Sequence, residues 1–524
     1  MTMWTTPPSP LTTRLARWEP WLVPVALLVL AAALRLPDLP TRGTWDGDQG
    51  HDMLVLRTWV RDGVVPLLGP PTSIGDVHHG AWYYYLLAPV AFLTGGDSPL
   101  AVVAAIAVAG IAAVGVAWWL GRSIGGPWAG ALAGLILAVS TAAVDESTFI
   151  WNPNLIGLSS GLALTGTWLA WRGGSPWWWG LAAVGTAVTM QCHILGVALL
   201  PVVAVPLIVD ARRRRLGRAV PSAIAVVALA AYLPLLVNEL TTSFSEVRAA
   251  LTYATSDRDA ASAALPIRFL IVGLRVVSWP LVGLITAAVI PAFVATAGVV
   301  AIAIARRHDR AVGWLGLGLL WSSVFLSVAA PSLASVVPGL PNDHYHAFAD
   351  PMVVVLVGLG LAALVAAPGP IGPAAAGVTL VAILGWNLTH QPPSVHPDGG
   401  WPAGETAGAR VDAVLGEAGI GREATVLLRS IPDFKSTEAV AYPLVRLGRA
   451  VVAETTKGTA PGSAASPVDA AGWVLLCDDL FRDVTGAACG GPAEDAQAMR
   501  DGFGALVERF EAAPGRWISV YRPA

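Results

Sequence analysis

Charged residues are scarce in this 524-residue chain, at 13% of the total, whereas soluble domains usually carry about 25%. The shortage is concentrated in the first three quarters of the sequence, and 55% of all residues are hydrophobic. This composition excludes a protein that is water-soluble throughout. It predicts an integral membrane protein with several spans.

Lysine is almost absent and occurs only as Lys435 and Lys457. The net charge is −3, so the chain has no basic face that would bind the phosphates of a nucleic acid. We therefore expect no nucleic-acid partner. Cationic roles in the first three quarters of the chain must fall to arginine or histidine.

The chain has only three cysteines. Cys192 lies in an apolar stretch and is expected to be a small buried residue. Cys477 and Cys489 lie in the more polar C-terminal part. A disulfide between them is plausible if that part lies outside the cytosol, and the sequence alone leaves this open.

Long apolar runs predict a membrane all-α bundle with about eleven transmembrane helices. A run of this kind crosses a hydrocarbon core about 30 Å thick at 1.5 Å per residue. The expected spans are residues 21–36, 99–120, 127–144, 154–171, 176–191, 193–209, 219–237, 280–304, 312–330, 347–367 and 371–387. Two further apolar segments, 82–92 and 265–279, are expected to be interfacial or re-entrant, the second with a partial twelfth span as the alternative.

Arginines in the short connections set the expected orientation. When the spans are counted between them, five clusters fall on one side: Arg14 with Arg17, Arg122, Arg172, residues 212–218, and residues 306–310. The positive-inside rule makes that side cytoplasmic. The other side then receives a large first loop, 38–98, and the C-terminal part, in a protein of the cytoplasmic membrane.

The predicted domains are a transmembrane domain at 1–390 and a small soluble α/β domain at 398–524 outside the cytoplasm. Short strands are expected at 424–430, 451–454, 472–477 and 517–521, and helices at 410–418 and 494–510. A stretch rich in proline and glycine, 387–402, is the expected linker.

The first outer loop carries the densest group of polar residues. Asp46, Asp48, His51 and Asp52 follow the first span within seven residues. Carboxylates there are expected either to cap a helix that runs to Arg61 or to act on a substrate. No metal ligands are assigned, because the spacing fits no specific signature, but a divalent metal is possible from the residue types.

Polar residues beside other spans complete the candidate site. Each lies at an outer loop, where a polar side chain next to lipid is costly and suggests a function; the alternatives are turns, helix starts and hydrogen bonds within the bundle. They are His78 and His79 in the first loop, Asp145, Glu146 and Asn152 in the second, Gln191 and His193 at the meeting of two spans, and His344 and Tyr345 at the entrance to a late span.

In this order the motifs resemble the GT-C superfamily of membrane glycosyltransferases, near the family 39 and aminoarabinose-transferase-like group. Asp48-Gln49 stands where relatives have an Asp-Glu pair, and His78-His79-Gly80 precedes an aromatic helix. Gln191-Cys192-His193 stands in the place of a later Lys-Gly motif, and His344-Tyr345-His346 in the place of a tyrosine-containing span entrance. The resemblance covers about residues 20–390. It departs at Gln49 and in the absence of the phosphate-binding lysines.

The resemblance implies transfer of a hexose or pentose from a polyprenyl-phosphate donor to a glycan, lipid or protein acceptor. Asp48 would be the general base, with Asp46 as second choice. Donor phosphate and lipid would contact Arg57, His78, His79, Gln191, His193, His344 and Tyr345. Substrate would contact His51, Asp52, Asp145, Glu146 and Asn152. The rival classes are a secondary transporter, for which no internal repeat is found, and a non-enzymatic receptor.

Overall fold

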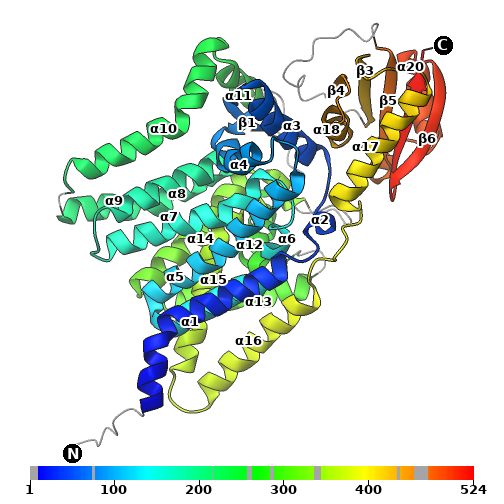
Figure 1. Cartoon of the computed structure of the whole chain (residues 1–524). Helices are drawn as coiled ribbons and strands as arrows, with labels where there is room; N and C mark the ends of the chain where they lie inside the picture. Colours follow the sequence, from blue (N-terminus) through cyan, green and yellow to red (C-terminus); the bar gives the residue numbers. More distant parts are fainter. Residues whose placement is uncertain are drawn as a thin grey trace, which may run out of the picture.

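The computed structural model describes residues 10–72, 77–214, 216–255, 263–283, 288–335, 344–432, 437–453 and 470–523. Within the described residues, helices dominate the chain up to Thr389, and a small sheet domain follows at one end of the bundle (Figure 1). Asp76, two positions before His78, and Asn342 and Asp343, directly before His344, lie outside the described residues, as do both lysines.

Helices of very different length build the membrane part. Their bounds are α1 Pro10–Arg35, α2 Leu39–Arg42, α3 Gly47–Asp62, α4 Trp82–Leu93, α5 Pro99–Val139, α6 Thr141–Asp145, α7 Ile156–Trp171, α8 Trp178–Cys192, α9 Leu199–Arg214, α10 Ala219–Thr241, α11 Ser245–Thr255, α12 Leu265–Val282, α13 Val289–Ala305, α14 Arg310–Ala329, α15 Asp350–Val365 and α16 Ile371–Thr389. Short 3-10 turns are η1 Asn152–Leu155, η2 Ile194–Ala198, η3 Pro331–Ala334 and η4 Ala347–Ala349. A two-stranded sheet in the first loop pairs β1 Leu68–Pro71 with β2 His78–Gly80.

Seven helices in the described part of the chain are long and apolar enough to cross a membrane. Among them, α5 has two arms, because Gly126 adopts a φ of 82° before Pro127. The arms correspond to the expected spans 99–120 and 127–144. Apolar helices at Trp21–Arg35 and Val289–Ala305 are shorter. The predicted multi-span bundle is confirmed, and the count of about eleven stays a prediction.

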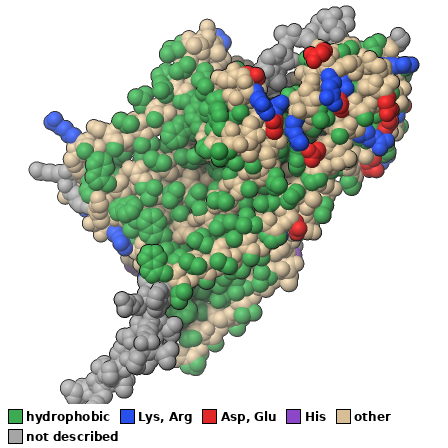
Figure 2. Space-filling view, in the orientation of Figure 1, with side chains coloured by type: hydrophobic (Ala, Val, Ile, Leu, Met, Phe, Trp, Pro, Cys, Tyr) green, Lys and Arg blue, Asp and Glu red, His purple; other side chains and the backbone are tan. Residues whose placement is uncertain are grey.

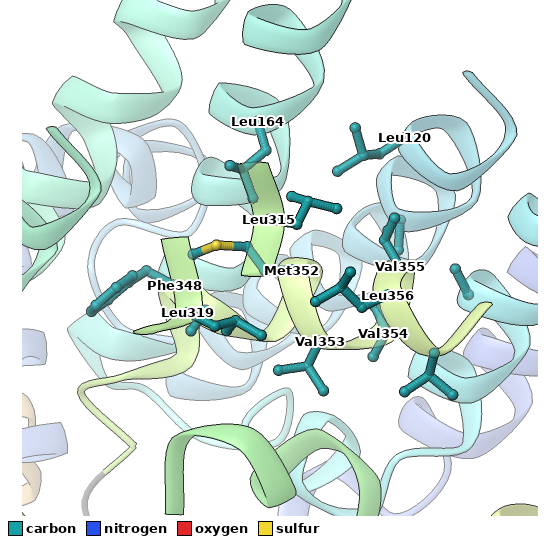
Figure 3. Packing of buried hydrophobic residues seen from close by; sticks show 14 of the residues in the cluster. Leu120, Leu164, Leu315, Leu319, Phe348, Met352, Val353, Val354, Val355 and Leu356 are labelled. Carbon is teal, nitrogen blue, oxygen red and sulfur yellow. The ribbon is translucent and has the colours of Figure 1, made fainter. Parts of the chain in front are cut away.

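The core of the bundle forms around α15, which is buried along most of its length. Met352 and the run from Val353 to Leu356 contact leucines of α5, α7 and α14 (Figure 3). Such a helix, apolar on every side, belongs in the centre of a bundle. On the face seen in Figure 2 the surface of the bundle is largely apolar, and most of the charged side chains lie on the C-terminal domain.

Arginines gather at the end of the bundle opposite the C-terminal domain. Arg172 donates to the Ser123 carbonyl at 2.8 Å, and Arg310 donates to the Trp171 carbonyl at 2.8 Å. These contacts join three of the connections that the sequence places on one side. We call this end the arginine end, and the opposite one, where α2, α3, α6 and α17 lie, the domain end.

The expected span at 280–304 is wrong in its first part. Helix α12 runs through Pro280 to Val282 and ends at Gly283, whose φ of 71° favours glycine, and a separate helix, α13, begins at Val289. Arg275 of α12 donates to the Leu333 carbonyl, and the Leu281 carbonyl accepts from Asn387 near the end of α16. Both the middle and the end of α12 therefore contact the domain end. Because α12 is also long and apolar enough to cross a membrane, the choice between an interfacial helix and a partial span stays a prediction.

The C-terminal domain is an α/β fold, as predicted. Its elements are α17 Gly400–Glu417, β3 Val426–Ile431, α18 Glu438–Arg446, β4 Val451–Ala453, β5 Gly472–Asp478, η6 Asp479–Phe481, α19 Arg482–Thr485, α20 Pro492–Asp501, β6 Ala505–Ala513 and β7 Arg516–Arg522. The sheet order is β4-β3-β5-β7-β6. Strands β4, β3 and β5 are parallel, and β5, β7 and β6 are antiparallel.

Two expectations for this domain have clear outcomes. The helix expected at 494–510 is wrong beyond Asp501, because Gly502 ends α20 with a φ of 70° and strand β6 follows. A turn at Gly515, with a φ of 76°, then pairs β6 with β7. Cys477 and Cys489 form a disulfide.

Candidate functional site

The second loop, between α6 and α7, connects several segments that carry predicted site residues. The Ile150 carbonyl accepts from Gln49 of α3 at 2.7 Å. Asn152 donates to the Cys192 carbonyl at 2.5 Å, and Asn154 accepts from the His344 ring at 2.7 Å. Four segments far apart in the sequence therefore meet at the domain end. The role of Asn152 seen in these contacts is to hold the end of α8 in place.

Asp46 and Asp48 have different surroundings at the start of α3. Asp46 is the N-cap residue: its carboxylate accepts from the Gly47 amide at 2.8 Å, and Gln49 accepts from the Asp46 amide. Arg516 of the C-terminal domain lies 3.5 Å from the same carboxylate. Capping thus accounts for Asp46. Asp48, in the first turn, is exposed at the domain end.

Asp52 is a buried carboxylate, 1% exposed, held by two tyrosines. Tyr83 and Tyr84 of α4 donate to its two oxygens at 2.7 and 2.8 Å. Burial raises the pKa of Asp52 to about 7, and the hydroxyls of Tyr83 and Tyr84 partly oppose this rise. The contact joins α3 to the aromatic helix, which makes Asp52 a structural link between the two elements.

His51 contacts the C-terminal domain directly. Its Nδ1 lies 2.7 Å from Oε1 of Glu438, the first residue of α18, and Glu438 is buried. Burial lowers the pKa of the imidazole, but the charge and hydrogen bond of Glu438, with Asp52 and Asp48, raise it to about 9. His51 is therefore a cation at neutral pH and keeps 20% of its side chain exposed.

Two further histidines of the candidate set, His79 and His193, lie against each other. The rings of His79 and His193 lie 4.5 Å apart, and Tyr345 stacks on His193 at 4.3 Å. Nδ1 of His79 accepts from the Ile194 amide, and Nδ1 of His193 accepts from the Leu195 amide. Each ring thus carries its proton on Nε2. Burial, with the neighbouring His78, lowers the pKa of His79 to about 3, so this ring is neutral.

Three other candidates are held by nearby partners. His78 pairs with Glu246 of α11 at 3.0 Å. Arg57 forms an ion pair with Asp97, which also pairs with Arg61. The amide oxygen of Gln191 faces Gly80, where a Cβ atom would lie 2.0 Å from it, so Gln191 packs against β2. These contacts hold the first loop on the bundle.

Glu146 lies deeper than its neighbour Asp145, which is exposed. The Trp279 indole donates to Glu146 at 2.6 Å. Glu146, Asn154 and Asp350 line a cavity of about 30 Å³, which is room for about two waters. A sugar cannot enter a space of that size, so Glu146 as a substrate contact would require the cavity to open.

Sequence reasoning missed Glu438, Tyr83, Tyr84 and Trp279 as partners of the candidate residues. The run Trp82-Tyr83-Tyr84-Tyr85 was visible, and a carboxylate near an aromatic helix needs hydroxyl donors once buried. For Glu438 no sequence signal exists, since it lies 387 positions from His51.

No group of three histidine, cysteine, aspartate or glutamate side chains within the described ranges is placed to hold a metal. A divalent metal in the site stays a prediction.

A family model described as dolichyl-phosphate-mannose-protein mannosyltransferase matches residues 78–237. The fold resembles the apo crystal structure of ArnT from Cupriavidus metallidurans, with a TM-score of 0.56 at 14% identity over 96% of this chain and 98% of that one. In fold and in this partial family match, the chain is similar to the GT-C superfamily of membrane glycosyltransferases. The predicted resemblance is thereby confirmed.

Two further structures show the same fold. ArnT from Cupriavidus metallidurans bound to undecaprenyl phosphate has a TM-score of 0.51 at 15% identity, covering 95% of this chain and 97% of that one. The Archaeoglobus fulgidus oligosaccharyltransferase in complex with Zn and sulfate has a TM-score of 0.50 at 13% identity, covering 92% and 71%. A search of curated protein sequences gives no match.

Proposed function

We propose that this protein transfers a sugar from a polyprenyl-phosphate carrier to an acceptor hydroxyl at the outer face of the cytoplasmic membrane, with Asp48 as general base. The acceptor is a glycan, a lipid or a protein. The observation that carries the proposal is the exposed carboxylate of Asp48, in the first turn of α3 at the domain end.

The orientation follows from charge. The arginine connections contact one another at the end of the bundle away from Asp48, and the positive-inside rule assigns that end to the cytoplasm. Asp48 and the C-terminal domain then lie outside the cytoplasm. The disulfide between Cys477 and Cys489 supports this side, because disulfides persist in oxidising compartments.

The proposed step is a direct displacement. Asp48 accepts the proton of the acceptor hydroxyl while the oxygen of that hydroxyl bonds to the anomeric carbon of the sugar. The bond between that carbon and the phosphate oxygen breaks, and polyprenyl phosphate leaves with the electron pair. The ArnT structure bound to undecaprenyl phosphate supports a lipid phosphate as the leaving group in this fold.

The carrier would reach the site from the lipid. Helix α10 exposes most of its apolar surface and touches the first loop, where the Trp82 indole donates to the Ala230 carbonyl. His79 and His193 lie next to this contact, and their Nε2 protons are suited to donate to the sugar or phosphate oxygens. Tyr345 extends the same stack.

The test uses membranes that contain the full chain and radiolabelled polyprenyl-phosphate sugars. We expect the wild-type chain to transfer label to an acceptor fraction, and Asp48→Asn to lose at least about 100-fold in rate, as expected when a general base is removed. Asp62→Asn, at the exposed far end of α3, is the matched control and should stay within about twofold.

Asp46→Asn separates the two catalytic candidates. Asparagine caps helices as well as aspartate does, so this variant should remain active if Asp46 only caps α3. Failure of the wild-type chain to transfer any of the sugars, or full activity of Asp48→Asn, would overturn the proposal.

A further inference from the structure

The departing phosphate needs a cation, and most cations near the domain end are engaged elsewhere. Arg57 and Arg61 pair with Asp97. Arg35 donates to the Leu137 and Ala138 carbonyls and to Ser147. His79 is neutral. No lysine precedes Lys435.

His51 is placed to meet this need. It follows Asp48 by three positions on α3, so both side chains lie on one face of the helix. Its Nδ1 points to Glu438 at 2.7 Å, which leaves Nε2 on the other side of the ring. A phosphate bonded to Nε2 would lie close to the proposed base.

The C-terminal domain is built to bring Glu438 to this position. Helices α18 and α3 lie side by side (Figure 1), and they approach so closely that a Cβ atom on Gly50 would lie 2.1 Å from the Glu438 carbonyl oxygen. The Trp45 indole donates to the next carbonyl, that of Ala439, at 2.9 Å. Two successive residues of α18 are thus fixed against the start of α3.

We propose that Glu438 of the C-terminal domain is a positioning residue of the transfer site and holds His51 as the imidazolium that binds the donor phosphate. This inference rests on the proposed function. It gives the C-terminal domain a direct part in the reaction, since the catalytic helix alone does not supply the partner that keeps His51 charged and oriented.

The charges around His51 decide its protonation. Glu438 faces it from α18, Asp48 and Asp52 from α3, and the nearest groups of α4 are the hydroxyls of Tyr83 and Tyr84 on Asp52. With Glu438 present the pKa of His51 is about 9. Without the Glu438 charge, burial opposes the cation and the imidazole loses its proton at a lower pH.

The experiment measures kcat/KM for a polyprenyl-phosphate sugar against pH in the full chain. In Glu438→Gln we expect the loss of kcat/KM relative to wild type to shrink as the pH falls, because a lower pH returns the proton to His51. At pH 8 we expect a loss of at least about tenfold, because a pKa one unit or more below the pH leaves under about a tenth of the rings charged. The matched control is Glu508→Gln, which removes the ion pair with Arg410 on the same domain and should keep the wild-type profile.

His51→Arg is the second variant, because arginine stays charged at every pH of the assay. We expect it to remain active and to lack the decline near pH 9 that the wild-type chain shows. A Glu438→Gln profile parallel to wild type at all pH values would overturn the proposal, as would a decline near pH 9 that persists in His51→Arg. If Glu438→Gln fails to fold, His51→Arg alone decides. A wild-type chain that transfers no sugar would instead count against the proposed function.

Discussion

Trp45 fastens the C-terminal domain to the membrane part, and its removal tests how the two parts are joined. Its side chain is 3% exposed. It packs edge-on against Trp401 at 4.5 Å and near Tyr442 at 5.7 Å, and its indole donates to the Ala439 carbonyl. The contacts reach α17 and α18 together.

The expected cost of Trp45→Ala follows from the size of the lost contact. Truncation of a buried tryptophan costs about 3–5 kcal/mol. Since each 1.4 kcal/mol is about tenfold in an equilibrium, separation of the two parts becomes at least about 100-fold more frequent.

Hydrogen exchange measures this opening at backbone amides in the first turns of α3 and α18, which face each other at the interface. We expect protection at Gly50, Val440 and Ala441 to fall by about 100-fold, in line with the opening equilibrium. Trp473→Ala is the matched control, because Trp473 stacks on Phe503 at 5.2 Å within the C-terminal domain. Protection in Trp45→Ala within about threefold of wild type would refute the reasoning, as would an equal loss in Trp473→Ala.

Three further predictions concern other contacts. Gly50→Ala places a Cβ atom 2.1 Å from the Glu438 carbonyl oxygen and should reduce sugar transfer at least about tenfold by separating α18 from α3. The control Gly157→Ala, where a Cβ atom would meet nothing within 4 Å, should leave transfer unchanged. Equal transfer rates in the two variants would contradict this. Replacing Cys477 and Cys489 by serine should destabilise the C-terminal domain by about 3 kcal/mol. A reductant should then lower the melting temperature of the wild-type chain but not that of the serine variant. An equal drop in the two proteins would contradict this. The pKa of Asp52 rises from 3.8 to about 7 on folding, chiefly by burial, so its contribution to stability is full below pH 3.8 and is lost as the pH rises through 7. Asp52→Asn should therefore gain in melting temperature relative to wild type between pH 5 and 8. Parallel plots of melting temperature against pH for the two proteins would rule this out.

Hydropathy and charge predicted the membrane part well, because lipid tolerates only helices with apolar surfaces. The predicted spans 99–120 and 127–144 meet at the kink at Gly126. The error at 280–304 arose because apolar residues continue across Gly283, whose positive φ ends α12. Composition cannot distinguish one long span from two helices with a break between them.

In the C-terminal domain the error at 505–510 has a similar cause. Leu506, Phe510 and their neighbours suit a helix or a strand, and the pairing with β7 decides for the strand. For the site, the sequence pointed to the polar first loop and to the entrances of the spans. It could not show that His51 meets Glu438, since that contact depends on how the C-terminal domain packs against the first loop.

The most direct test of the central claim is a single-turnover measurement of sugar transfer by the purified full chain, with donor affinity measured in parallel. The account predicts that Asp48→Asn slows the chemical step by about 10²–10⁴-fold while the Kd for the polyprenyl-phosphate sugar stays within about threefold. An unchanged rate of transfer, or a loss that weaker donor binding explains in full, would contradict it.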